Sequence, residues 1–96
     1  MKSSELAPTV RKWLRISSTG VDSEIGQTID ACVSDLANAG AVNTNLDDPL
    51  VQQAVKLYCK AQFGYDADAD KFASAYEHLK SALSLSSDYN TADTTT

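Results

Sequence analysis

Apolar residues recur along most of this chain at the three- and four-residue spacing of amphipathic helices. A helix is predicted from Asp22 or Ser23 to about Ala39, and Gly40 follows where a left-handed residue typically ends a helix. Its apolar stripe consists of Ile25, Ile29, Cys32, Val33 and Leu36. A shorter first helix is predicted from about Ser4 to Leu14, with Ser4 as its N-cap and Pro8 near the first turn.

The clearest helix start is Asp48-Pro49, a capping carboxylate followed by the residue favoured at the first helical position. This helix is predicted to run to about Phe63 and to end at Gly64. One side carries Leu50, Ala54, Leu57, Tyr58 and Ala61, and the nearly opposite side carries Val55, Cys59 and Phe63. A helix that is apolar on two sides is typical of a central position, between other helices or between subunits.

A fourth helix is predicted from about Asp70 to Leu83 or Leu85, with Phe72, Tyr76, Leu79 and Leu83 facing inward. No segment alternates as a β-strand does, so the predicted fold is all-α, a small bundle of four helices. This helical domain is expected to span residues 1–85. Residues 86–96 have no periodicity and little apolar content, which predicts a flexible C-terminal tail.

Composition and charge narrow the functional classes. A chain of 96 residues has room for one modest core, and no apolar run approaches the length that crosses a bilayer. The absence of a basic-then-apolar leader pattern favours a cytosolic protein. The net charge of -5 disfavours tight nucleic-acid binding. Basic residues gather in residues 1–15 and none occurs from Ile16 to Val55, so one copy could dock its basic end on a neighbour's acidic side.

Two short patterns suggest chemistry, and each has a simpler structural interpretation. The segment Asp66–Glu77 places acidic residues at positions 1, 3, 5 and 12 of a calcium loop, but Lys71 stands where that loop needs glycine. The favoured interpretation is a helix N-terminus. Asp22-Ser23 is similar to the modified serine site of acyl carrier proteins, but Glu24 follows where carriers have an apolar residue. An ordinary N-cap pair is favoured there.

The cysteines and the histidine also suggest no site. Cys32 and Cys59 fit no zinc spacing and are expected to be free thiols packed like small apolar residues. His78 has no candidate nucleophile near it in the sequence. The sequence therefore predicts no catalytic, cofactor-binding or metal-binding residues, and the protein is not expected to be an enzyme.

The order of the predicted elements resembles a known family. A short helix ending in VRKWLRI (Val10–Ile16) is followed by DSEIGQTIDACVSDLANAG (Asp22–Gly40) and DDPLVQQAVKLYCKAQFGY (Asp47–Tyr65). A closing helix with aromatic and leucine positions completes the pattern. Over roughly residues 4–85 the chain resembles the head–tail connector (adaptor) proteins of long-tailed bacteriophages and prophages. The segment Phe63–Asp70 departs from the family pattern.

The resemblance implies a structural role at the head–tail junction of the virion, after assembly in the host cytoplasm. Subunits would form a homo-oligomeric ring, twelve-fold in the virion, beneath the portal protein. The ring would extend the DNA channel, let DNA pass without specific binding, and offer a platform to a stopper or tail-completion protein. The candidate partner-binding residues are Val55, Cys59, Phe63, Leu85 and Tyr89. The alternatives are a small helical regulatory module, such as an antitoxin-like protein, and an acyl-carrier-like protein.

Overall fold

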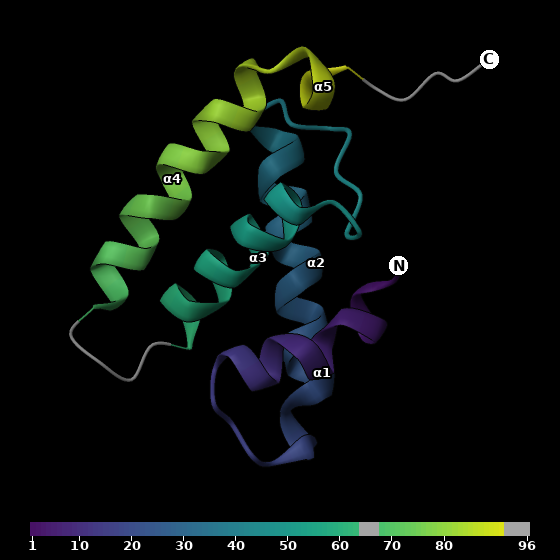
Figure 1. The fold of residues 1–96 in the computed structure, drawn as a ribbon, viewed down its shortest axis with the longest axis vertical. Coiled ribbons are helices and arrows are strands. Elements are labelled where there is room, and N and C mark those ends of the chain that lie inside the picture. Colours follow the sequence, from purple (N-terminus) through teal and green to yellow (C-terminus); the bar gives the residue numbers. More distant parts are fainter. Residues whose placement is uncertain (64–67, 92–96) are drawn as a thin grey trace.

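The computed structural model describes residues 1–63 and 68–91, and these residues form helices and no strand (Figure 1). The four main helices are α1 (Ser3–Trp13), α2 (Asp22–Asn38), α3 (Pro49–Gln62) and α4 (Ala69–Leu85). A 3₁₀ turn, Thr19–Val21, leads into α2, and a four-residue helix, α5 (Ser87–Asn90), follows α4. The prediction of an all-α fold with four main helices is confirmed.

The helices pack in two pairs that meet between α2 and α3. In Figure 1, α1 crosses the lower half of α2, while α4 lies along α3 on the other side of the molecule. One hydrophobic core collects side chains from all four helices and from the connection between α2 and α3. Its buried residues are Leu6, Ala7, Val10, Ile25, Ile29, Cys32, Leu36, Ala41, Leu46, Val51, Ala54, Val55, Cys59, Tyr76 and Leu83.

The start of α1 differs from the prediction. The N-cap position is Lys2 rather than Ser4, and Pro8 lies inside the helix rather than near its first turn. The side chain of Glu5 accepts a hydrogen bond from the Lys2 amide at 3.0 Å, which satisfies one donor at the helix start. An interior proline costs a backbone hydrogen bond. The helix still forms because its apolar side is buried against α2.

The first two helices end in the same kind of turn but with different residues. Gly40 adopts a φ of 109° after α2, as predicted, and Arg15 adopts a φ of 59° after α1. In both turns the left-handed residue and the residue after it donate their amides to carbonyls of the last helical turn. The left-handed conformation costs a non-glycine residue roughly 1–2 kcal/mol, so Arg15 holds a strain that Gly40 avoids.

Asp48 organises the junction between α3 and α5. One of its carboxylate oxygens accepts the Leu50 amide at 2.8 Å, the N-cap bond that the sequence predicts. The other accepts the Tyr89 hydroxyl at 2.9 Å. One side chain therefore caps α3 and holds α5 on the body of the protein.

The beginning of the predicted tail forms a short helix that packs on the helical body. The Asn43 amide donates to the Tyr89 carbonyl at 2.9 Å, and the Asn43 side chain donates to the Asp88 carbonyl at 3.1 Å. Periodicity could not show this, because α5 is a single turn held by hydrogen bonds rather than by an apolar stripe. Residues 92–96 of the predicted tail lie outside the described residues.

Replacing Asp48 should cost more stability than replacing Tyr89. Asp48→Ala removes the cap and the bond to α5, which together contribute about 2 kcal/mol to the free energy of unfolding. Tyr89→Phe removes only the second bond and should cost about 1 kcal/mol. Urea unfolding followed by far-ultraviolet circular dichroism measures both. Equal losses would show that the cap of α3 contributes nothing.

Candidate partner-binding surface

The calcium-like segment is, in its described part, the start of a helix. Asp66 and Ala67 lie outside the described residues, and α4 already includes the segment from Ala69 onward. The Lys71 ammonium lies 3.7 Å from a carboxylate oxygen of Asp68. Among the residues that the structure describes, no cluster of His, Cys, Asp and Glu side chains could hold a metal ion. No described helix is long and apolar enough to span a membrane.

The carrier-like serine lies in an ordinary helix start. Ser23 is exposed in the first turn of α2. Its neighbour Asp22 accepts a hydrogen bond from the Arg11 guanidinium at 2.7 Å. This pair ties the C-terminal end of α1 to the beginning of α2, so Asp22 has a structural role. His78 is exposed on α4.

Two of the five predicted partner-binding residues belong to the core of the monomer. Val55 and Cys59 are fully buried, so a partner could reach them only if the core opened. Burial raises the pKa of both Cys32 and Cys59 to about 12, so both thiols stay protonated and pack as small apolar groups. The second apolar side of α3 is therefore covered by the chain's own helices, and contact of Val55 and Cys59 with a partner stays a prediction that requires the core to open.

The structure does not bring the other three predicted residues together into one site. Phe63 is half-buried at the end of α3, and Tyr89 is half-buried with its hydroxyl bound to Asp48. Leu85 is 83% exposed at the corner between α4 and α5. The large apolar side chains that the sequence analysis missed at the surface are Met1, Val42 and Leu50. No periodic signal marks Val42, because it lies in the irregular connection between α2 and α3.

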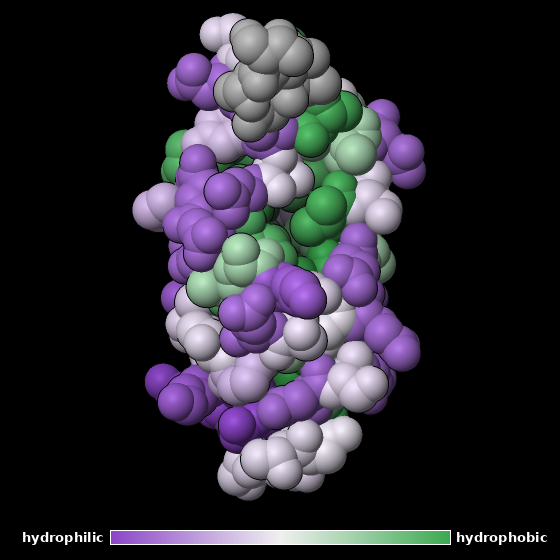
Figure 2. All heavy atoms as spheres, turned by 90° about the vertical axis from the view of Figure 1, so that its right-hand side faces the viewer, coloured by the Kyte–Doolittle hydropathy of each residue, from purple (hydrophilic) through white to green (hydrophobic). Residues whose placement is uncertain are grey.

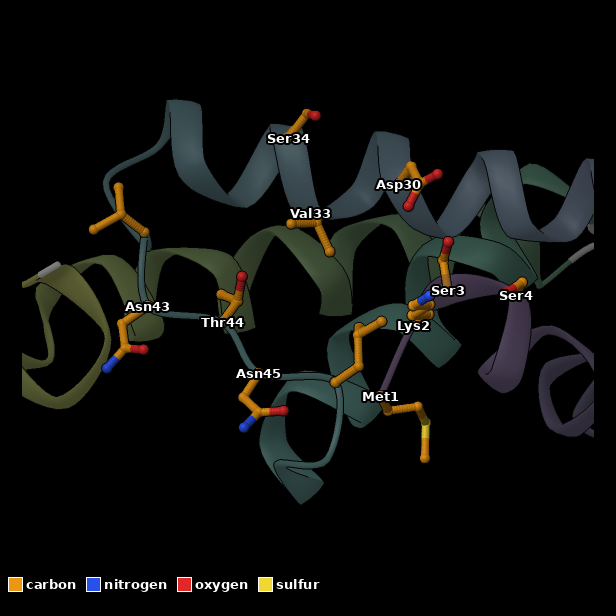
Figure 3. Close-up of a pocket in the computed structure, with 12 residues that line it drawn as sticks. Met1, Lys2, Ser3, Ser4, Asp30, Val33, Ser34, Asn43, Thr44 and Asn45 are labelled. Carbon is orange, nitrogen blue, oxygen red and sulfur yellow. The ribbon is translucent and has the colours of Figure 1, made fainter. Parts of the chain in front are cut away.

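An open groove of about 850 Å³ runs between the N-terminal residues, α2 and the connection to α3 (Figure 3). Figure 2 shows the face on the right of Figure 1, where apolar residues lie in a hollow between polar ones. The groove is lined by Met1, Lys2, Ser3, Ser4, Asp30, Val33, Ser34, Val42, Asn43, Thr44, Asn45 and Leu46. A small-molecule pocket is more enclosed and more apolar. This mixture of apolar and polar groups instead suits contact with another protein.

A polar link joins α2 to α4 at the edge of the core. The Tyr76 hydroxyl donates to a carboxylate oxygen of Asp35 at 2.7 Å, and the Lys80 ammonium donates to the same oxygen at 3.0 Å. The hydrogen bond from Tyr76 lowers the pKa of Asp35 against the opposing effect of burial, and Lys80 lowers it further. Burial, together with the bond to Asp35, raises the pKa of Tyr76. The phenol stays protonated and the carboxylate ionised, so the link holds the two helices in register.

A comparison with protein families shows to which class of protein this helical chain belongs. The family model described as "Phage connector protein" matches residues 8–90, from α1 to the end of α5. The chain therefore belongs to the phage connector protein family, which confirms the resemblance seen in the sequence. This is a family of structural proteins of the phage particle that interact with other head or tail proteins. Comparisons with curated proteins and with solved structures gave no match.

The link between Asp35 and Tyr76 should make stability depend on acid pH. Because the folded-state pKa of Asp35 is depressed, its stabilising effect is present above the unfolded value of about 3.9. The effect is lost as the pH falls through the folded pKa. Asp35→Asn should therefore lower the free energy of unfolding at neutral pH, and the difference from the wild type should shrink below about pH 4. Urea titrations at several pH values measure it.

Asp30→Asn is the matched control, since Asp30 lies on the same helix but is exposed. It should leave both the stability and its pH dependence unchanged. Asp35→Asn could instead stay less stable than the wild type by the same free energy of unfolding down to pH values well below about 4. This result would show that the ionised carboxylate is not the stabilising form.

Proposed function

We propose that this chain is a subunit of the head–tail adaptor ring that assembles beneath the portal protein. The observation that carries the proposal is the family match across residues 8–90, which covers most of the helical body. In this function the ring, twelve-fold in the virion, extends the DNA channel and provides the docking platform for a stopper or tail-completion protein. The subunits assemble in the host cytoplasm and then become part of the virion.

The exposed corner between α4 and α5 supports docking on another protein. A leucine that is 83% exposed gains free energy when a partner covers it, at roughly 25 cal/mol for each Å² of apolar surface removed from water. The corner is also well defined, because Ser86 caps α5 and Tyr89 holds α5 to Asp48. A rigid apolar side chain on a fixed corner can act as a binding hot spot. We assign this corner to the contact with the portal protein.

The charge of the chain supports a channel that does not retain DNA. Its net charge is -5, and no basic residue occurs from Ile16 to Val55. A wall of this charge gains nothing from counterion release, so DNA can pass without adhering to it.

Binding to the portal protein of the same phage tests the function. The wild-type chain should form a ring on the portal, visible by native mass spectrometry and by electron microscopy. Leu85→Ser should weaken portal binding by about tenfold or more, as expected for a buried anchor at an interface. Its unfolding transition should stay where it is, because an exposed leucine contributes little to the core. Leu50→Ser, at a side chain 48% exposed on α3, is the matched control and should bind normally.

A wild-type chain that remains monomeric and also fails to bind the portal would exclude the adaptor function. Normal binding by Leu85→Ser would leave the function intact but move the portal contact away from this corner.

A further inference from the structure

The C-terminal corner of α1 presents basic side chains without carboxylate partners. Lys12 and Arg15 are exposed, and in the described part of the chain neither forms an ion pair. The neighbouring Arg11 differs, since it is bound to Asp22. Arg15 also holds the left-handed backbone conformation that glycine adopts without strain.

The open groove at the other end of α1 has the chemistry to receive such a side chain. Asp30 projects from α2 at its edge, exposed and without a hydrogen bond or an ion pair among the described residues (Figure 3). Lys2 also lines the groove, but no ion pair joins it to Asp30. Side chains with hydroxyl and amide groups that can accept hydrogen bonds also line the groove, and its apolar lining includes Val33 and Val42. A guanidinium carries five donors on an aliphatic stem, so this combination suits arginine.

The basic end of α1 and the groove cannot meet within one subunit. Arg11 pairs with Asp22 at the start of α2, while Ser3, at the other end of α1, lines the groove together with Asp30. Arg15 therefore lies at the end of the pair that is remote from Asp30. The 11 residues of α1 alone separate the two ends by about 16 Å at 1.5 Å per residue.

We propose that Arg15 of one copy enters the groove of the next copy and pairs with its Asp30, with Lys12 adding positive charge at the same contact. The inference rests on the proposed function, because it describes how neighbouring subunits of the ring recognise one another. A surface that fits a different surface of an identical chain gives head-to-tail association, and such association closes into a ring when the rotation between copies permits. Charge complementarity of this kind sets the partner and the orientation.

Charge reversal at both positions tests the contact in the full chain assembled on the portal. Arg15→Glu and Asp30→Arg should each weaken ring assembly by about tenfold or more, because like charges then face each other. The double variant restores opposite charges and should return assembly toward the wild-type level. Glu24→Arg is the matched control, because Glu24 is an exposed acidic residue of α2 outside the groove. It should assemble as the wild type does. Native mass spectrometry across a concentration series measures each chain.

Arg15→Gly separates assembly from folding. This change removes the charge and also relieves the left-handed backbone, so the monomer should stay fully folded while ring assembly weakens. Circular dichroism confirms the fold, and the same assembly measurement gives the loss. Wild-type assembly by Arg15→Gly would overturn the proposed contact.

The outcomes distinguish this inference from the function on which it rests. Rescue by the double variant supports the pairing of Arg15 with Asp30. Normal assembly of both single reversals, or weak assembly without rescue in the double variant, overturns the pairing and leaves the adaptor function standing. A wild-type chain that forms no ring even on the portal overturns both.

Discussion

One stripe of α2 is completely excluded from water, and the other helices are positioned against it. Ile25, Ile29, Cys32 and Leu36 all have no exposed surface. Burying an aliphatic side chain of this size contributes about 1.5–3 kcal/mol, and a chain this short has a single core in which to obtain that energy. The pairing of α1 with α2 and of α2 with α3 follows from this burial, while α4 reaches α2 through Tyr76. The free energy gained by this burial is large enough that α1 stays helical despite Pro8 in its interior.

Polar links at the edge of the core decide how the packed helices are oriented. Arg11 and Asp22 join α1 to α2, Asp35 and Tyr76 join α2 to α4, and Asp48 and Tyr89 hold α5 beside α3. Apolar packing is not directional, whereas each of these bonds accepts only a narrow range of geometry. Each link fixes only the two helices that it joins. None of the three covers the connection between α2 and α3, which stays open on one side. The groove exists because this irregular connection packs through Ala41 and Leu46 and leaves Val42 at the surface.

The core buries Val51, Ala54, Val55 and Cys59 of α3, so the proposed assembly has to depend on other features. Val55 and Cys59 are enclosed by the chain's own helices. The surface features that the proposals use are the exposed Leu85 corner, the mixed groove and the basic end of α1. Contacts built from such features are specific in orientation but individually modest. In the proposed ring each contact is repeated around the circumference, so contacts that are individually modest add together.

The sequence by itself determined the four main helices and most of their inward-facing positions. The stripe of α2, the Asp48-Pro49 start of α3 and the Gly40 end of α2 each depend on residues within a few positions of one another, and local patterns encode such features directly. Tertiary structure decided what covers each face. Whether Val55 and Cys59 meet another helix or another subunit depends on long-range packing, so their apolar character could not separate the two cases. The sequence pattern also did not predict the groove, the hydrogen bonds that attach α5 or the left-handed conformation of Arg15. These features arise from irregular segments whose conformation is set by contacts distant in the chain.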